Sequence, residues 1–175
     1  MHGGARHIAY GDSQHEGCEV EHLALLRALH VLGVVWWIGG VAMITSIVLP
    51  LSRGSEGRVS GRELFDRVEL RFARQARVAT LLVGITGFAM VHLLHAWGRY
   101  DSLSYWWLHA MTLIWALFTL MLFVIEPLLQ RRFLRKPETD PAGTMRRMQR
   151  VHWVLLLLSV VTIFGAVAGS HGVAF

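Results

Sequence analysis

The chain has little cysteine and lacks the short motifs that mark many soluble enzymes. Cys18 is its only cysteine, so no disulfide can form within the chain. No C-x-x-C pair is present, and covalent c-type haem attachment through C-x-x-C-H is therefore excluded. The sequence also contains no Walker-type loop and no H-E-x-x-H, so nucleotide-binding and zinc-protease chemistry lack their usual residues.

Charged residues are also scarce in four long apolar stretches. These lie at about 23–49, 78–97, 105–128 and 152–171. Hydrophobic residues make up 54% of the 175 residues, and roughly 20 apolar residues suffice to span a bilayer. We therefore predict an all-α integral membrane protein, an antiparallel four-helix bundle over 23–175 preceded by a polar tail over 1–22. The tail has no apolar h-region, so we expect no cleaved signal peptide there.

Basic residues are concentrated in two of the connections between these stretches. Seven of the 17 Lys and Arg lie in 53–77, and another seven lie in 131–150. Short loops rich in Lys and Arg stay on the cytoplasmic side. The sequence therefore predicts that both termini are outside, in a multi-pass protein of a bacterial inner (cytoplasmic) membrane. The net charge of +5 indicates this topology and contact with anionic lipid, and we expect no nucleic-acid partner.

The two basic connections differ in their predicted structure. In the first, Ser60 and Glu63 form an S-x-x-E capping box, followed by apolar residues at helical spacing with arginines between them. This pattern predicts an amphipathic helix that extends the second span. In the second, KPETDP (136–141) contains two prolines that interrupt a helix, and it predicts a loop.

Histidines provide the main functional signal. Five of them lie near the predicted outer ends of the spans: His30, His92, His95, His109 and His171. A buried imidazole needs a partner, and one metal shared by several histidines would satisfy them together. Imidazole suits iron, copper and zinc. Because the spans contain no cysteine, a thiolate site is disfavoured.

The residues around these histidines favour haem over a bare ion. Gly33 and Trp37 follow His30 at helical spacing, and Gly84 precedes His92 on its helix. Small residues would let a flat macrocycle approach, although the same pattern also packs membrane helices together. Arg27 lies one turn before His30 on the same face, where it could meet a haem propionate or reach lipid headgroups.

The predicted ligand pair is His30 and His109, which would hold one haem b from opposite sides. His92 is the substitute for either metal ligand. His95 and His171 remain for a second haem or for hydrogen bonds to the propionates. Bis-histidine ligation leaves iron without an open site, which favours electron transfer over oxygen chemistry.

The two halves of the chain share a faint repeat. Leu29-His30 precedes Trp36 by the same spacing as Leu108-His109 precedes Trp115. The returning stretches share T-x-F-x6-H, at 86–95 and 162–171. Each half would then be a hairpin with one histidine near its start and one near its end. Internal repeats of this kind occur in membrane proteins.

The segment R-A-L-H-x5-W-x-x-G-G (Arg27 to Gly40) resembles the first helix of the CopD-like membrane domain family, associated with copper resistance. It is also similar to the related haem-containing membrane protoporphyrinogen oxidases. The similarity extends to ITGF (85–88) and WLHAM (107–111) and covers roughly 23–171. The resemblance implies a membrane bundle that binds b-type haem or handles copper, and it carries over His30 most directly. Met111 stands where the oxidases typically have lysine, which argues against protoporphyrinogen oxidation.

These observations favour a membrane b-type haem protein that transfers electrons at the outer (periplasmic) face. Its partners would be a quinol, an outer-face redox protein or a larger membrane complex, and a quinol-linked oxidoreductase activity stays open. One alternative is a copper-handling transport or resistance protein, whose tail histidines would collect the metal. Another is an accessory subunit of a larger respiratory or photosynthetic complex.

Overall fold

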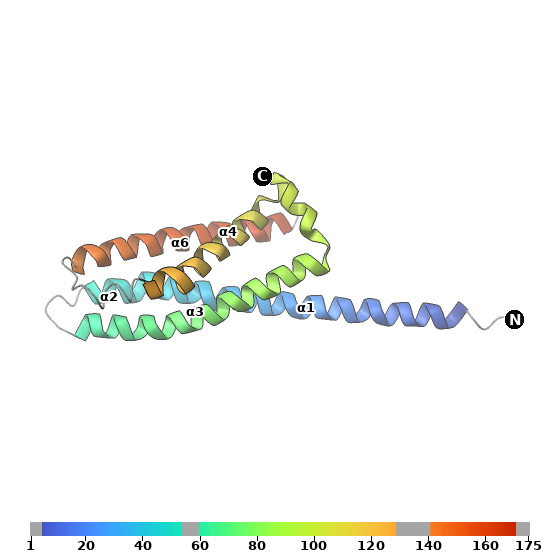
Figure 1. Cartoon of the computed structure of the whole chain (residues 1–175), viewed down its shortest axis with the longest axis horizontal. Helices are drawn as coiled ribbons and strands as arrows, with labels where there is room; N and C mark the ends of the chain where they lie inside the picture. The colour runs from blue at the N-terminus through green and yellow to red at the C-terminus, as the bar shows by residue number, and fades with distance from the viewer. Residues whose placement is uncertain (1–4, 54–59, 129–140, 171–175) are drawn as a thin grey trace.

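The structure is a computed structural model that describes residues 5–53, 60–128 and 141–170, which are helical apart from short turns (Figure 1). Four helical stretches are long and apolar enough to cross a membrane. They are Val20–Leu51, Arg71–Leu93, Leu103–Leu128 and Arg146–Gly169. The four predicted spans are thereby confirmed, and the chain has the helices of a multi-pass membrane protein.

The first helix is longer than the predicted span. Helix α1 (Ala5–Met43) begins well inside the predicted polar tail, and Figure 1 shows it extending past the other helices toward the N-terminus. It continues through a π-helical segment, η1 (Ile44–Val48), into the short α2 (Leu49–Arg53). Helix α3 (Ser60–Leu93) confirms both the start predicted from Ser60 and the extension of the second span.

The second predicted span was too long at its C-terminal end. Helix α3 ends at Leu93 because His95 adopts a left-handed conformation with φ 48°, which a helix cannot continue. The 3₁₀ segments η2 (Ala96–Asp101) and η3 (Leu103–Tyr105) then turn the chain into the third span. A span that is predicted from apolar content alone gives no indication that the helix ends here.

The third span comprises α4 (Trp106–Leu120) and the π-helical segment η4 (Met121–Ile125), and the helix continues to residue 128. The last helix, α6 (Pro141–Ser170), starts at a proline, a residue that suits the first turn because its missing N–H is not needed there. The rest of the predicted loop at 136–141 lies outside the described residues.

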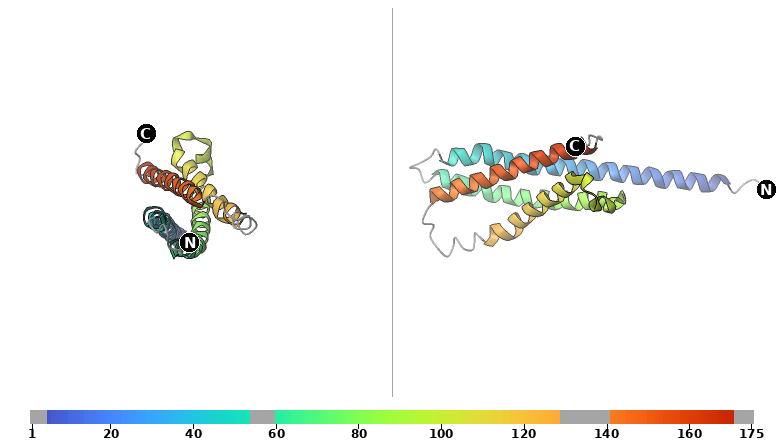
Figure 2. Two further views of the ribbon diagram at one scale, coloured as in Figure 1. Left: turned by 90° about the vertical axis from the view of Figure 1, so that its left-hand side faces the viewer. Right: turned by 90° about the horizontal axis from the view of Figure 1, so that it is seen from above.

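Two helix pairs share one core. Helix α1 packs along α3, and α4 packs along α6 (Figure 2). The shared core draws on all four: Trp37, Val41, Ala76, Ala79, Val83, Ile114, Phe118 and Leu155. We call the end of the molecule that carries Arg71 and Arg150 the basic end. The opposite end, with His30, His92, His95 and His109, is the histidine end.

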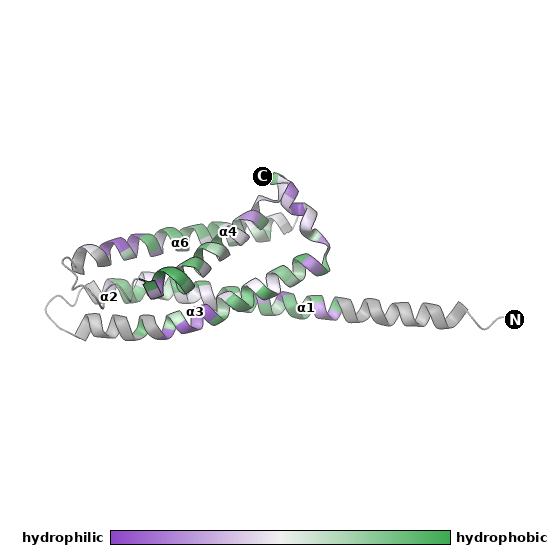
Figure 3. Ribbon diagram, viewed as in Figure 1, coloured by the Kyte–Doolittle hydropathy of each residue, from purple (hydrophilic) through white to green (hydrophobic). Residues whose placement is uncertain are grey.

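The outward faces of the helices are apolar. Ile85, Leu113 and Phe164 are each about two-thirds exposed, at 67%, 69% and 66%. Figure 3 shows hydrophobic residues along the spans and hydrophilic ones toward their ends. A soluble protein rarely exposes so much continuous apolar surface, whereas lipid tails would cover it. The buried polar residues are all hydroxyls among those described, namely Thr45, Thr80, Thr86, Ser159 and Thr162.

Each π-helical segment ends two residues before a proline, Pro50 in one case and Pro127 in the other. In both, the residue before the proline donates its N–H to the carbonyl five residues back. A proline ring would clash with the carbonyl four residues back in a regular α-helix. The wider π turn accommodates the ring. In the sequence, the two prolines are therefore the residues that indicate where the π-helical segments lie.

Arg77 of α3 fastens the second of these segments. The Leu122 carbonyl has lost both of its possible helical donors, because the Glu126 N–H bonds to Met121 and Pro127 has no N–H. Arg77 Nε donates to this carbonyl at 3.2 Å. Its Nη2 donates to Glu126 Oε1, also at 3.2 Å. Arg77 therefore ties α3 to the third span at the basic end.

A glycine substitution tests the close packing between α3 and α4. A Cβ on Gly84 would lie 2.6 Å from the Trp115 indole, whose Nε1 donates to the Thr80 carbonyl at 2.9 Å. Gly84→Ala is expected to lower the free energy of unfolding by about 1–3 kcal/mol through overpacking. Gly39→Ala is the control, since nothing lies within 4 Å of its Cβ. If Gly84→Ala and Gly39→Ala lower the free energy of unfolding equally in detergent, the Trp115 contact does not limit the packing.

Candidate functional site

His30 lies half-buried on α1, against α3. Its Nδ1 is 3.1 Å from the Val83 carbonyl and 3.1 Å from Thr86 Oγ1. A Cβ on Gly87 would lie 3.1 Å from His30 Cε1, so this glycine lets the ring lie close to the α3 backbone. Three residues of one neighbouring helix, Val83, Thr86 and Gly87, therefore determine the position of the imidazole.

The Thr86 hydroxyl decides the direction of this hydrogen bond. Its single proton is donated to the Leu82 carbonyl at 2.7 Å, so the oxygen can only accept from His30. Nδ1 of His30 is then the protonated nitrogen, and in the neutral ring Nε2 carries the lone pair. Nε2 has no hydrogen-bond partner among the described residues. Metal-binding histidines have this arrangement, in which the second nitrogen is anchored by a hydrogen bond.

Burial differs from helix to helix beyond the level of His30. Between residues 20 and 32 of α1 no side chain is buried, and Gly33 is the first buried position. On α4 the first buried residue is Ile114, and on the described part of α6 the last is Gly165. On α3 and in η2, in contrast, Val91 and Ala96 are buried beyond the level of His30, so burial continues on that side of the histidine end.

His109, the predicted second ligand, is held by the segment that precedes α4. Its Nδ1 lies 3.1 Å from the Tyr105 carbonyl and its Nε2 lies 3.1 Å from the Tyr100 carbonyl. The imidazole also meets the Tyr100 ring edge-on, with centroids 5.5 Å apart. In this conformation both ring nitrogens are occupied, and a ligand role would require the ring to leave Tyr100.

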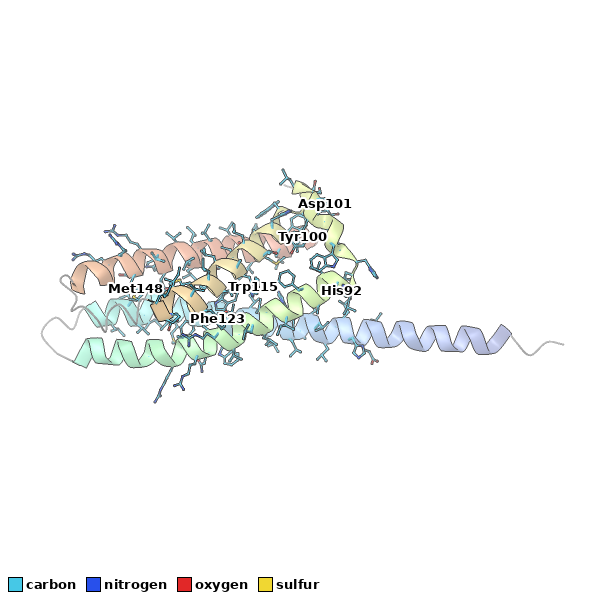
Figure 4. The ribbon with its side chains drawn as sticks, viewed as in Figure 1. His92, Tyr100, Asp101, Trp115, Phe123 and Met148 are labelled. Atoms are coloured by element: carbon cyan, nitrogen blue, oxygen red, sulfur yellow. The ribbon has the colours of Figure 1, made fainter. Side chains whose placement is uncertain are left out.

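The other predicted site residues lie apart from the His30 anchor. His92, in the last turn of α3, is exposed, and so is His95, whose backbone N–H bonds to the His92 carbonyl at 3.0 Å (Figure 4). Arg27 is exposed one turn before His30. His171 lies outside the described residues. Both hydrogen-bond partners of His30 lie on α3, and the predicted grouping of these histidines around one metal stays a prediction.

A series of four aromatic contacts leads from Trp115 to His109 and was not anticipated from the sequence. Trp115 meets Phe88 edge-on at 5.3 Å between centroids, and Phe88 stacks with Trp97 at 6.3 Å. Trp97 in turn stacks with Tyr100 at 6.2 Å, and Tyr100 meets His109. Figure 4 shows Trp115 within the helices and Tyr100 in the turn beyond them. This series of rings fixes η2 over the ends of α3 and α4.

The glycines near the histidines serve helix packing in this structure. Trp106 fills the space at Gly165, Trp107 that at Gly169, and Trp115 that at Gly84. A Cβ on Gly33 would lie 2.9 Å from the Val83 side chain. At these positions the small residues therefore make room for neighbouring side chains. This is the helix-packing explanation that the sequence pattern left open beside the approach of a macrocycle.

Within the described residues, no three histidine, cysteine or acidic side chains come together as ligands of a metal ion. A bare copper or zinc ion needs three or four protein ligands, whereas porphyrin supplies four nitrogens to iron and leaves one or two positions for the protein. No protein-family model matches the chain, and neither curated proteins nor solved structures give a match.

Proposed function

We propose that the chain is a membrane protein that binds haem b at its histidine end, where His30 Nε2 would hold the iron. The anchored Nδ1 of His30, bonded to Val83 and Thr86, is the observation that carries this proposal. The resemblance of Arg27–Gly40 to the CopD-like family agrees with a haem or copper role.

The residues of the chain have distinct roles in this proposal. His30 binds the iron, while Thr86 and the Val83 carbonyl fix its tautomer and orientation. The packed core below His30, including Trp37 and Phe118, excludes water from one side of the site. Bound haem b supplies one-electron chemistry. The proposed role is electron transfer at the outer face with a quinol or a redox protein.

The proposed setting is a bacterial inner membrane that holds an antiparallel four-helix bundle. The basic end would face the cytoplasm, because Lys- and Arg-rich connections remain on that side. Both termini and the histidine end would then be periplasmic. The exposed arginines at the basic end, among them Arg71, Arg74 and Arg150, suit anionic lipid headgroups.

The proposal of haem is tested by the visible spectrum and the metal content of the purified protein. We expect the spectrum of a b-type haem that is extracted by acid solvent, at one haem per chain, with no stoichiometric copper. Copper bound without haem would favour the copper-handling alternative. A protein with neither would contradict the haem proposal and favour the accessory-subunit alternative.

The proposed topology is tested by thiol labelling in intact cells. Native Cys18 should react with a membrane-impermeant maleimide without permeabilisation. A cysteine introduced as Asp140→Cys, in a Cys18→Ser background, should react only after the membrane is permeabilised. The reverse pattern would invert the bundle and place the histidine end in the cytoplasm.

A further inference from the structure

Four residues with metal-binding side chains follow one another at helical spacing near the start of α1. They are His15, Cys18, Glu19 and His22, in the sequence H-x-x-C-E-x-x-H. From composition this region was predicted to be only a polar tail, but α1 begins at Ala5 and continues through it. Because successive residues of an α-helix are turned by about 100°, the four lie within an arc of about 100° on one face.

Each of the four residues has two others of the set one turn away. Cys18 and His22 are four residues apart, and Glu19 and His22 are three apart. His15 lies three residues before Cys18 and four before Glu19. Residues at these spacings have Cβ atoms about 5–6 Å apart on a helix, so their side chains can reach a common ion. A Glu-x-x-His pair on one helix ligates metal in this way in the di-iron carboxylate proteins.

The four donor groups suit zinc. Zn²⁺ takes thiolate, imidazole and carboxylate ligands, and it is usually four-coordinate and tetrahedral. Calcium and magnesium take oxygen ligands, of which this set has only the Glu19 carboxylate. The Cys18 thiol releases its proton to water when it binds the ion as a thiolate. Zn²⁺ has no redox chemistry, so its binding requires no oxidant or reductant.

The four residues lie where α1 leaves the bundle. The first span begins at Val20, and Figure 1 shows α1 continuing past the other helices toward the N-terminus. Of the four side chains the structure describes only that of His22, which is exposed, so the set is defined by the course of the helix. His22 precedes His30 by about 12 Å along the helix axis, at 1.5 Å per residue. The set is therefore separate from the His30 site.

The part of α1 before Val20 needs more stabilisation than its own sequence supplies. It contains Gly11 and Gly17, and a glycine within a helix costs about 1 kcal/mol relative to alanine. A helical segment of about 15 residues is marginal in water without tertiary packing. An ion shared by residues one turn apart would favour the helix, because the unfolded chain does not hold the ligands in place.

We propose that His15, Cys18, Glu19 and His22 form a zinc site on the part of α1 that extends beyond the histidine end. The Cys18 thiolate and the His22 imidazole bind the ion from adjacent turns, and Glu19 and His15 complete its four ligands. The site does not depend on the proposed haem, and it gives a role to the single cysteine and to two of the histidines that precede the first span.

The test uses the purified full chain, stripped of metal with a chelator and then titrated with Zn²⁺. We expect one zinc ion per chain. Bound zinc should slow the reaction of Cys18 with maleimide, because the ion then holds the thiolate. Cys18→Ser and His22→Ala should lose this zinc. Glu19→Gln should bind it more weakly than wild type, whereas the control Glu21→Gln should not, since residue 21 lies outside the arc.

Several results would overturn the zinc site. One is equal zinc binding by wild type, Cys18→Ser and His22→Ala, and another is a Cys18 labelling rate that zinc leaves unchanged. Equal zinc affinity of Glu19→Gln and Glu21→Gln would do the same, because these conservative variants differ in the helix face that loses its carboxylate. Wild type that holds haem but binds no zinc would overturn this inference alone. Wild type that binds zinc without haem would overturn only the haem proposal.

Discussion

Replacing His30 with alanine is expected to remove the haem or to leave it weakly held and high-spin. Its Nδ1 is anchored through Val83 and Thr86 at 3.1 Å each, and, unlike both ring nitrogens of His109, its Nε2 has no hydrogen-bond partner among the described residues. Loss of an axial ligand removes the iron–nitrogen bond outright, whereas loss of an anchoring partner typically costs about 10–100-fold in metal affinity. Thr86→Val should therefore bind haem more weakly without abolishing binding.

The measurement is haem content and the oxidised and reduced spectra of purified variants, with added imidazole as a rescue. Imidazole should restore the low-spin spectrum in His30→Ala, because it can enter the space that the side chain vacates. His152→Ala is the matched control, since His152 is a half-buried histidine of α6 whose Nδ1 bonds to the Met148 carbonyl at 2.9 Å. A His30→Ala protein with unchanged haem content and spectrum would exclude His30 as a ligand.

The elements of the fold that depend on composition along the chain were predictable. Apolar stretches of sufficient length identified all four spans, and the S-x-x-E pattern at Ser60 identified the start of α3. The ends were less predictable where local backbone geometry decides. The left-handed residue His95 stops α3 inside an apolar stretch, and hydropathy contains no signal for it.

Which side chains meet inside the bundle could not be predicted from the sequence. Successive residues of a helix point about 100° apart, so contacts depend on how each helix is rotated about its axis. Lipid is as apolar as a protein core, and membrane helices therefore need no apolar face to mark their inward side. His30 could be proposed as a ligand from the sequence alone. Its anchor on Thr86, the Tyr100 contact of His109 and the tryptophans at the glycines all depend on that rotation.

The pairing of Arg77 with Glu126 likewise could not be predicted from the sequence, although the sequence contains one of its causes. Pro127 deprives the Leu122 carbonyl of a helical donor, and that creates a need for an outside donor within a span. The sequence indicated the need, but only the packing of α3 against the third span shows that Arg77 meets it. Glu126 then balances the charge that Arg77 brings.

Arg77→Ala is expected to lower the free energy of unfolding by about 2–3 kcal/mol, measured by detergent-induced unfolding in mixed micelles. It leaves the Leu122 carbonyl without a donor and Glu126 without its cation, and such losses are costly where water is scarce. Both side chains are partly exposed, at 33% and 19%, which keeps the loss below that of a fully buried pair. Arg74→Ala, an exposed neighbour one turn earlier, is the control and should change stability by less than about 0.5 kcal/mol.

Pro127→Ala tests whether Arg77 binds the Leu122 carbonyl because Pro127 lacks an N–H. An alanine restores a backbone N–H that can reach the Leu122 carbonyl from within the helix, so the Arg77 Nε bond is no longer needed there. Arg77→Ala should then cost less in the Pro127→Ala background than in wild type, with a coupling of about 1 kcal/mol or more. Glu126→Gln, which retains an acceptor oxygen but removes the charge, should cost less than Arg77→Ala. Additive effects of Arg77→Ala and Pro127→Ala would show that Arg77 acts only through Glu126, and that the proline-broken turn does not depend on it.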